Sequence, residues 1–585
     1  MTGIDWGSDA VAALVRSLSF KHVALVPGSS FRGLHDSLVN YLDDGDLEML
    51  VCLHEEHAVA IAHGYAKVTN TPMLAIVHAN VGLMHASMAF FDAWADRVPM
   101  VVLGATGPVD AAKRRPWIDW LHTSRDQAAI VRPYTKWDDQ PGSVEATMES
   151  ITRAYQIACT PPYGPTYVVL DVAMQEERIE RAIPMPKLER FAPPKLPVPA
   201  PEDVRTAVAI MRAAKRPVIF IGRATRDLTA WNERIALAEA LDARVITDVK
   251  AGAGFPTAHR LHVGLTSSRL TAEGVAALKE ADAILSLESV DLAGSLKQVF
   301  GTTPTPAKVV ACSVDRYLHN GWSMDHQALP GVDLDIVVEQ SSLVHAMLAE
   351  LGAAPAPVHA NGTANARPSV TTEPLPEGQM GIASFSEGLN DAFASSEVCY
   401  IRLPLGTNGG AAFSFTHPLD FLGGDGGGGV GAGPGLAVGA ALALRGTSRL
   451  PVAVLGDGDY LMGLTAIWTA AANKIPLLVI VANNRCYYND IVHQERIARQ
   501  RDRPVERKWI GQTISDPAPD LAMLARGQGA IGIGPVTDRA GMREALAQAV
   551  EQVRGGAVCV VDILVAPEYD KRGEAAITGY AGSAR

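Results

Sequence analysis

Cysteine and long apolar runs are scarce in this sequence. Its 585 residues include six cysteines. They are scattered, and most lie in or beside short apolar runs: Cys52, Cys159, Cys312, Cys399, Cys486 and Cys559. This scatter argues against a disulfide or zinc framework and favours reduced thiols in the core of a cytoplasmic protein. The apolar runs have about 5–8 residues, far short of the ~20 that a membrane-spanning helix needs, so we expect no membrane partner.

Positive charge is also in short supply. Lys and Arg number 51 against 63 Asp and Glu, which gives a net charge of −12, and no basic block stands out. This argues against nucleic acid as a partner. The N-terminal segment has early acidic residues and no long apolar core, so a signal peptide is not expected. The 48% hydrophobic and 19% charged residues are typical of a soluble globular enzyme, and the length predicts about three or four domains.

Short apolar runs alternate with helical patterns along most of the chain, which predicts an α/β fold with parallel, doubly wound sheets. The proline-rich segment 183–201 and the Ala-, Pro- and Thr-rich segment 353–378 are expected to be linkers. They separate three expected domains, 1–182, 202–352 and 379–570. The runs expected to form strands are 22–27, 47–53, 73–78, 100–104 and 166–172; 216–222, 243–249, 283–289 and 308–314; and 398–403, 450–455, 476–482 and 557–565.

The chain is organised around the stretch 454–487. One apolar run leads into the turn Gly456-Asp457-Gly458-Asp459, and a second run ends at Asn483-Asn484. In a strand–helix–strand unit, the 27 positions between Asp457 and Asn484 bring both residues to one edge of a parallel sheet, where ligands bind. One carboxylate, one amide oxygen and a nearby backbone carbonyl suit Mg²⁺, which completes its shell with ligand phosphates and water. The alternative is a turn and a loop that only shape the backbone.

This arrangement resembles the GDG…NN signature of thiamine-diphosphate (ThDP) enzymes, in particular the acetolactate synthase and benzoylformate decarboxylase group. The resemblance implies ThDP and Mg²⁺ as cofactors. The side chains of Asp457 and Asn484 and the backbone carbonyl of Cys486 would bind the metal. Gly456, Gly458 and Asp459 would complete the cofactor-binding turn.

The resemblance also implies an arrangement of domains and subunits. The family order is a pyrimidine-binding domain, a central domain and a diphosphate-binding domain. The cofactor lies between the first domain of one subunit and the last domain of its partner. A homodimer is therefore the expected minimum, and a homotetramer is expected.

A second motif lies in the first expected domain. The segment LHEEHA, residues 53–58, with the later GYAKVTNTP, resembles the family's HExxA…GYARxTGxP segment. There the glutamate at the Glu55 position meets N1′ of the aminopyrimidine and favours the tautomer whose N4′ imine removes the C2 proton. Glu55 is thus expected to be both catalytic and cofactor-binding. The alternative is a glutamate that begins a helix beside its positive end. His54 and His57 lack the HExxH spacing of a zinc site.

Three more residues are expected at the active site. His78 replaces the start of the family's usual TSGPG-like turn and resembles a histidine of benzoylformate decarboxylase, which could exchange protons with substrate. Ser29 could bind a substrate carboxylate or could cap the next helix instead. Gln127 resembles a glutamine that faces the cofactor in many relatives, but could also lie in a solvated loop. We can place no counterpart of that decarboxylase's second catalytic histidine, which comes from its central domain.

The glycine-rich run 423–435 is expected to approach the cofactor, because glycine lets the backbone come close to a ligand. The resemblance implies that Val430 supports the bent cofactor and that the Gly428 carbonyl accepts from N4′. Gly406, Thr407 and Asn408 follow an expected strand and are expected near the diphosphate.

Together these features predict a ThDP- and Mg²⁺-dependent 2-oxo acid decarboxylase or carboligase, acting on a 2-oxo acid or dicarbonyl substrate. One alternative is an enzyme with the same cofactor that cleaves carbon–carbon bonds in 1,2-diketones or 2-hydroxy ketones. Another is a catalytically silent homologue that serves as a binding or regulatory subunit. FAD in the central domain is a less favoured possibility, since its arginine- and glycine-rich segments are not evident; Asp315 could contact an adenosine or simply end a strand.

Overall fold

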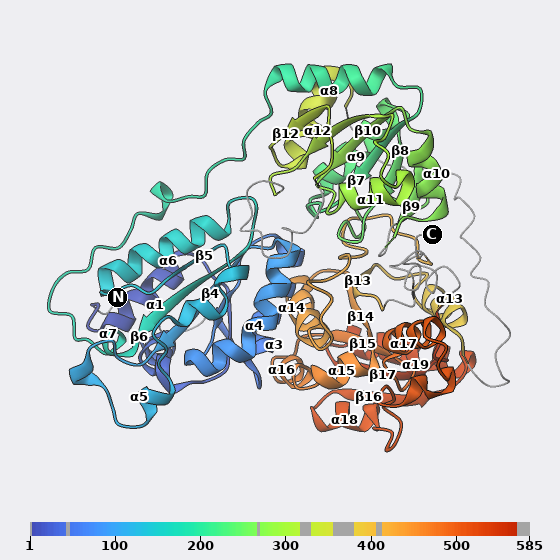
Figure 1. Ribbon diagram of the computed structural model, residues 1–585. Helices are drawn as coiled ribbons and strands as arrows, with labels where there is room; N and C mark the ends of the chain where they lie inside the picture. The colour runs from blue at the N-terminus through green and yellow to red at the C-terminus, as the bar shows by residue number, and fades with distance from the viewer. Residues whose placement is uncertain are drawn as a thin grey trace.

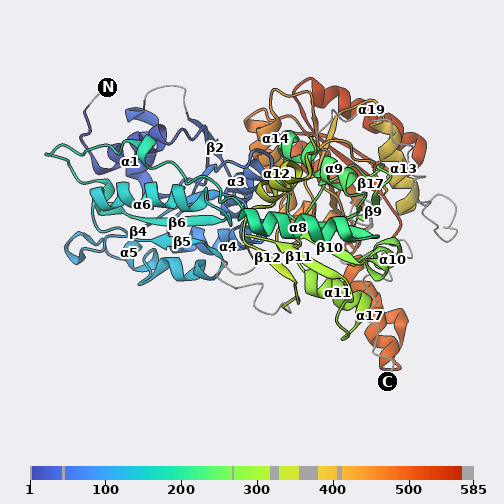
Figure 2. The ribbon, with the colours of Figure 1, turned by 90° about the horizontal axis from the view of Figure 1, so that it is seen from above.

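Three parallel β-sheets with helices on both faces make up the computed structural model of the protein (Figure 1). The structure describes residues 3–42, 47–265, 269–315, 329–354, 380–404, 407 and 412–569. Figures 1 and 2 place the first sheet to one side of the other two, and the second sheet lies above the third in Figure 1. The predicted α/β class with three doubly wound domains is confirmed.

The first sheet has the strand order β2-β1-β3-β4-β6-β5, and all of its pairs are parallel. Its strands are β1 (His22–Leu25), β2 (Glu48–Val51), β3 (Leu74–Ile76), β4 (Met100–Thr106), β5 (Trp137–Asp139) and β6 (Pro165–Asp171). The accompanying helices are α1 (Gly7–Ser17), α2 (Arg32–Asp36), α3 (Glu55–Thr69), α4 (Ala79–Asp96), α5 (Ile118–Leu121), α6 (Val144–Ala158) and α7 (Val172–Gln175).

The second sheet has the order β12-β11-β10-β7-β8-β9 and is also parallel. Its strands are β7 (Pro217–Ile221), β8 (Arg244–Thr247), β9 (His262–Leu265), β10 (Ala283–Leu287), β11 (Lys308–Cys312) and β12 (Leu334–Ile336). Its helices are α8 (Pro201–Ala213), α9 (Leu228–Ala240), α10 (Ala272–Glu280), α11 (Leu292–Phe300) and α12 (Gln340–Leu351).

The third sheet has the order β13-β14-β15-β17-β16, again parallel. Its strands are β13 (Val398–Arg402), β14 (Leu450–Gly456), β15 (Leu477–Asn483), β16 (Ile531–Val536) and β17 (Val558–Leu564). Its helices are α13 (Ile382–Ala392), α14 (Gly433–Leu444), α15 (Asp457–Met462), α16 (Ala466–Ala472), α17 (Tyr488–Gln500), α18 (Leu521–Gly527) and α19 (Arg539–Arg554).

The central strands explain why the sequence shows continuous apolar runs instead of alternating ones. Every residue of β4 and β15 is buried, because helices cover both faces of each sheet. Residues 183–200 form an irregular connection with one short 3₁₀ turn, Leu188–Arg190, as expected of a linker. The second predicted linker lies almost entirely outside the described residues. The exact domain boundaries stay predictions.

Helices α3 and α14 join the first domain to the last (Figure 1). A Cβ added at Gly64 of α3 would lie 2.1 Å from the Leu436 carbonyl oxygen, and one at Gly439 of α14 would lie 1.9 Å from that of Ile61. Side chains at these positions would therefore push the helices apart. Glycine on both helices allows their backbones to touch.

Candidate active site

The candidate metal-binding residues lie at the carboxyl ends of two adjacent strands. β14 and β15 pair in parallel with Gly456 opposite Ala482. Asp457 then begins α15, and Asn484 directly follows β15. The strand-end placement expected from the 27-residue spacing is thus confirmed.

Asp457 provides the test of whether a cation fits. Its side chain is buried, with the residue 4% exposed. The oxygen Oδ1 accepts from the Gly458 N–H at 3.0 Å, but Oδ2 is buried without a partner among the described residues. Burial raises the pKa of this carboxyl to about 6. A buried carboxylate oxygen with no donor is costly, and a bound divalent cation would offset that cost.

The turn after β15 brings further oxygens to the same edge. Asn484 Oδ1 accepts from the backbone N–H and the thiol of Cys486, at 3.2 and 3.5 Å. Cys486 and Thr513 lie opposite each other in an isolated antiparallel β-bridge. The two backbone hydrogen bonds of this bridge are made by the residues on either side of them, so neither bond uses the Cys486 carbonyl. This donor set of one carboxylate, one amide and one carbonyl fits a hard cation. Among the described residues, no group of three or more His, Cys, Asp or Glu side chains could hold a metal.

Asp459, two residues further on, holds the glycine-rich loop. Its Oδ1 accepts from the Gly431 N–H at 2.7 Å, and its Oδ2 lies 3.2 Å from Arg402 Nη1. Arg402 also pairs with Asp425 at 3.1 Å. Asp459 is therefore engaged within the protein, where it fixes the loop against the predicted metal-binding turn.

Two of the remaining predicted cofactor contacts, Gly428 and Val430, lie in this loop. Gly428 has a left-handed backbone with φ 77°, and a Cβ added there would meet nothing within 4 Å, so the space beside it is open. Val430 is 49% exposed. Thr407 is buried and its hydroxyl donates to the Pro404 carbonyl at 2.7 Å. Gly406 and Asn408 lie outside the described residues.

Glu55 is the first residue of α3 and is 8% exposed. The preceding His54 caps the helix by accepting from the Glu56 N–H. The Glu55 carboxylate faces α4: Oε2 lies 3.0 Å from His85 Nδ1, and a Cβ added at Gly82 would lie 2.9 Å from Oε1. Gly82 thus lets α4 approach this carboxylate.

A group of histidines surrounds this end of α3. The rings of His54 and His85 stack with centroids 4.8 Å apart, and His57 lies 5.3 Å from His54. His57 Nδ1 also lies 3.1 Å from Thr465 Oγ1 of the last domain. Burial, and then His54, lower the pKa of His57 to about 4, so this ring is neutral at physiological pH. Sequence reasoning did not include His85, which comes close only through helix packing.

His78 occupies the N-cap position of α4, shortly after β3, but makes no side-chain capping bond. Its Nδ1 lies 2.7 Å from Ser30 Oγ, which also accepts from the Ala79 N–H at 3.2 Å. Its ring meets that of His122 with centroids 4.7 Å apart. Burial lowers the pKa of His78, and His122 lowers it further. Neither Ser30 nor His122 was expected from the sequence. The one signal for Ser30 in the sequence is its position next to Ser29 in the turn after β1.

Ser29 and Gln127 have different surroundings from His78. Ser29 is exposed, and its carbonyl accepts from the Arg32 guanidinium at 2.9 Å. Gln127 is 0% exposed and donates to the Tyr167 hydroxyl at 2.7 Å and to the Ala105 carbonyl at 3.2 Å. Gln127 is therefore not in a solvated loop. Its role as a substrate ligand stays a prediction, and its burial between β4 and β6 weighs against that role.

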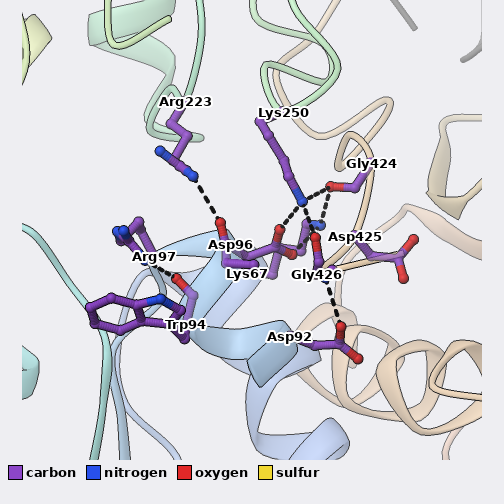
Figure 3. A network of polar contacts seen from close by, with 12 residues as sticks. Lys67, Asp92, Trp94, Asp96, Arg97, Arg223, Lys250, Gly424, Asp425 and Gly426 are labelled. Atoms are coloured by element: carbon purple, nitrogen blue, oxygen red, sulfur yellow. Dashed lines mark hydrogen bonds and ion pairs between the residues drawn. The ribbon is translucent and has the colours of Figure 1, made fainter. Parts of the chain in front are cut away.

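A network of charges ties the glycine-rich loop to the other two domains (Figure 3). Asp96, at the end of α4, accepts from Lys67 and from Lys250, each at 2.7 Å. Lys250 belongs to the central domain and also donates to the carbonyls of Gly424 and Gly426. Burial alone would raise the pKa of Asp96, but Lys250, Lys67 and His63 outweigh it and hold the pKa well below its usual value. Asp96 is therefore ionised and fully paired.

A cavity of about 310 Å³ lies beside this network, where the first and central domains meet. Its lining includes Lys67, Arg97, Arg223, Arg226 and Asp315. Asp315 Oδ1 accepts from Arg97 at 2.7 Å, and its Oδ2 accepts from Arg223 at 3.0 Å. The predicted contact of Asp315 with an adenosine would have to compete with both arginines.

Three family models match the chain in the order expected for its domains. Residues 5–130 match the thiamine pyrophosphate enzyme N-terminal binding domain, residues 204–309 the central domain, and residues 405–563 the C-terminal binding domain. The chain belongs to the ThDP-dependent enzymes. The matched segments make up more than half of the chain and include Glu55, Asp457 and Asn484.

Individual relatives are more distant. The chain is 26% identical to a "probable 2-ketoarginine decarboxylase" of Pseudomonas aeruginosa, over 88% of each chain. It is also 26% identical to an acetolactate synthase large subunit of Corynebacterium glutamicum, a match that spans 48% of this chain and 44% of the relative. The crystal structure of benzoylformate decarboxylase from Polynucleobacter necessarius superposes with a TM-score of 0.77 at 21% identity, covering 97% of this chain and all of that one. This likeness concerns the fold.

Among the described residues of this ThDP enzyme, no helix is both long enough and apolar enough to span a membrane.

Proposed function

We propose that this ThDP-dependent enzyme is a Mg²⁺-dependent 2-oxo acid decarboxylase or carboligase. The observation that carries the proposal is the buried, unpartnered Oδ2 of Asp457 at the end of β14, beside Asn484 and Cys486. The proposed substrate class follows from the names of its relatives, a probable 2-ketoarginine decarboxylase, an acetolactate synthase and a benzoylformate decarboxylase.

In this proposal, the last domain holds the metal and the diphosphate. Asp457 and Asn484 bind Mg²⁺ through their side-chain oxygens, and Cys486 binds it through its carbonyl. Asp459 positions the glycine-rich loop, so that the Gly428 carbonyl and the Val430 side chain face the cofactor. Gly456, Gly458 and Thr407 line the diphosphate.

The first domain supplies the groups that move protons. Bound ThDP would provide a carbanion that attacks a carbonyl and an electron sink that allows loss of CO₂. Glu55, which is buried at the start of α3, would hold the proton at N1′ of the aminopyrimidine. His78 exchanges a proton with the substrate oxygen, and Ser29 orients the substrate carboxylate. FAD has no role in this proposal.

We also propose that the active unit contains two or more copies of the chain, as the family resemblance implies. Exposed apolar side chains on α4 support this: Val81, Met84 and Met88 follow helical spacing on one face. These three side chains lie close to His85 and Glu55. A second copy of the chain that packs on them would therefore also cover the active site.

A substrate screen tests the proposed reaction. The purified protein with ThDP and Mg²⁺ is given pyruvate, benzoylformate, 2-ketoarginine and a cyclic 1,2-diketone, and CO₂ and carbonyl products are followed. CO₂ release from at least one 2-oxo acid is expected. Cleavage of the diketone alone, without CO₂ from any 2-oxo acid, would replace the proposal with a C–C hydrolase or lyase.

Glu55→Gln tests the assigned proton carrier. We expect turnover to fall by about 1,000-fold or more, because an amide cannot hold and return the N1′ proton. The affinity for ThDP, measured by calorimetry, should stay within a few-fold of the wild type, because the diphosphate is bound by another domain. Wild-type turnover in this variant would show that Glu55 is not the proton carrier. His345→Gln in the central domain, where the side chain is 75% exposed, is a suitable control.

A further inference from the structure

Glu55 has a histidine partner on the neighbouring helix. Glu55 begins α3, and His85 belongs to α4, where Gly82 and His85 are three positions apart and therefore share one face. The Nδ1 atom of His85 lies 3.0 Å from Glu55 Oε2. The glutamate side chain is 10% exposed, whereas the histidine side chain is 59% exposed. The proposed function gives His85 no role.

The chemistry of the two groups fixes the direction of this hydrogen bond. An ionised carboxylate can only accept, so His85 Nδ1 carries a proton and donates it to Oε2. The second oxygen of Glu55, Oε1, lies against Gly82, where an added Cβ would be 2.9 Å away. No described residue donates a hydrogen bond to Oε1. One carboxylate oxygen is therefore held within the protein, and the other is left for a ligand.

His85 is itself held in place by His54. The two rings stack with centroids 4.8 Å apart and an angle of 20° between their planes. The His54 ring is fixed because its Nδ1 accepts from the Glu56 N–H at 3.2 Å. Burial lowers the pKa of His54 and His85 lowers it further, while Glu55 raises it. His54 is thus a neutral ring at physiological pH, and His85 rests against it.

We propose that His85 is a positioning residue that acts through Glu55. By donating to Oε2, it fixes the plane of the carboxylate, so that Oε1 is the oxygen presented to N1′ of the aminopyrimidine. His85 itself exchanges no proton with substrate or cofactor. Small misplacements of a catalytic group slow a reaction strongly, so a carboxylate that can rotate is a poorer proton carrier. This inference rests on the proposed function, in which Glu55 holds the N1′ proton.

Two substitutions separate the N–H of His85 from its ring. Asparagine Nδ2 is two bonds from Cβ, as histidine Nδ1 is, so His85→Asn keeps a donor at that place and loses the ring. His85→Phe keeps a ring against His54 and loses the donor. If the N–H positions Glu55, His85→Phe loses activity and His85→Asn retains it. If only the packing of the ring matters, the order is reversed.

Steady-state kinetics with ThDP and Mg²⁺ compare these variants on the best substrate of the screen. We expect kcat to fall about 30-fold in His85→Phe, because the Glu55 carboxylate loses its fixed orientation. In His85→Asn, kcat should stay within about fivefold of wild type. The ThDP affinity, measured by calorimetry, should change less than about threefold in both variants. Should His85→Phe fail to fold, His85→Ala removes the same donor without added bulk, and the same loss is expected.

The central domain offers a matched control. His345 Nδ1 lies 2.8 Å from Glu233 Oε1, with the histidine side chain 75% exposed and the glutamate side chain 11% exposed. This pair has the same chemistry as the Glu55 pair, but it joins α12 to α9, outside the candidate active site. His345→Phe should therefore leave kcat within about twofold of wild type.

NMR of protein with ¹⁵N-labelled histidine, recorded without cofactor, gives a readout that needs no turnover. At about pH 9, where imidazoles are neutral, His85 should carry its proton on Nδ1. Glu55→Ala should remove this preference, because the acceptor is lost. The Nδ1–H form of His345 should be unchanged in the same sample, because Glu233 is intact.

Two results would overturn this role. One is a His85→Phe variant with kcat within about threefold of wild type, or a His85→Asn variant that loses as much as His85→Phe. The other is a preference of His85 for the Nδ1 proton that is absent or that survives Glu55→Ala. A wild-type protein that turns over no 2-oxo acid would instead overturn the proposed function, while the NMR result would still decide whether His85 holds Glu55.

Discussion

Asp457 is the residue on which the proposed Mg²⁺ site depends. In the protein alone it is a buried carboxyl with one oxygen unpartnered, and burial raises its pKa to about 6. The same desolvation that destabilises the anion makes a divalent cation a favourable neighbour. The unfavourable burial of this carboxylate is therefore the physical basis for the proposed metal site at this turn.

The pH dependence of metal binding follows from this pKa. Mg²⁺ binds the ionised carboxylate, so protonation competes with it as the pH falls below about 6. In the presence of ThDP, the apparent Mg²⁺ affinity should fall by about tenfold per pH unit in that range and level off above pH 7. Calorimetry from pH 5 to 8 measures this. Asp457→Asn should bind Mg²⁺ weakly at every pH, and a wild-type affinity that is flat down to pH 5 would contradict the assignment.

Residues that share a short motif could be predicted from the sequence, whereas those assembled by packing could not. Glu55, Asp457 and Asn484 stand in recognisable local patterns with a spacing that fixes their place at strand or helix ends. Ser30, His85 and His122 reach the same region from different elements, and the residues around His85 and His122 in the sequence do not indicate the contact. Gln127 illustrates the converse, because a likeness in sequence did not reveal that its side chain is enclosed between β4 and β6.

Among the secondary-structure elements, the strands missed from the sequence share one property. β5, β9, β12 and β16 are all at a sheet edge, whereas every interior strand was expected. Edge strands are covered less completely, and each of these four contains half-buried or exposed residues, such as Gly534 and Pro535 in β16. Continuous apolar runs report burial on both faces, so they revealed only the edge strands that have such a run, β2 and β13.

The α3–α14 contact shows how glycine determines helix packing here. Gly439→Ala would put a methyl carbon 1.9 Å from the Ile61 carbonyl oxygen, and backbone cannot move aside as a side chain can. We expect the variant to lose about 1–3 kcal/mol of stability, seen as a lower midpoint of urea unfolding. Gly541→Ala in α19 is the matched control, since its nearest neighbour would be a Val536 methyl at 3.4 Å. Equal midpoints for the two variants would mean that the helices are not in backbone contact.

At the scale of the whole molecule, the predicted catalytic groups are divided between two domains. Glu55 faces α4 of its own domain, and the Asp457 turn belongs to the third sheet. Within one chain, α3 and α14 bring these domains together. The proposed dimer, in which one subunit's first domain works with its partner's last domain, leads to a test by complementation.

Mixing two inactive variants should restore activity. In a dimer of Glu55→Gln and Asp457→Asn, one site carries both changes and the other carries neither. After random exchange of subunits in equal amounts, about a quarter of wild-type activity is expected. Each variant alone, taken through the same exchange, is the control. If both residues act within one chain, the mixture stays inactive.

The charge network around Asp96 has a consequence for how this chain can change over evolutionary time. The backbone of the glycine-rich loop is held by Lys67 from the first domain and Lys250 from the central one, while Asp92 accepts from the Gly427 N–H. A last domain grafted into a relative would carry the predicted metal-binding turn but not these distant anchors. An exchange of this domain between relatives would therefore have to carry such anchors together with the loop, even though the three sheets look like interchangeable modules.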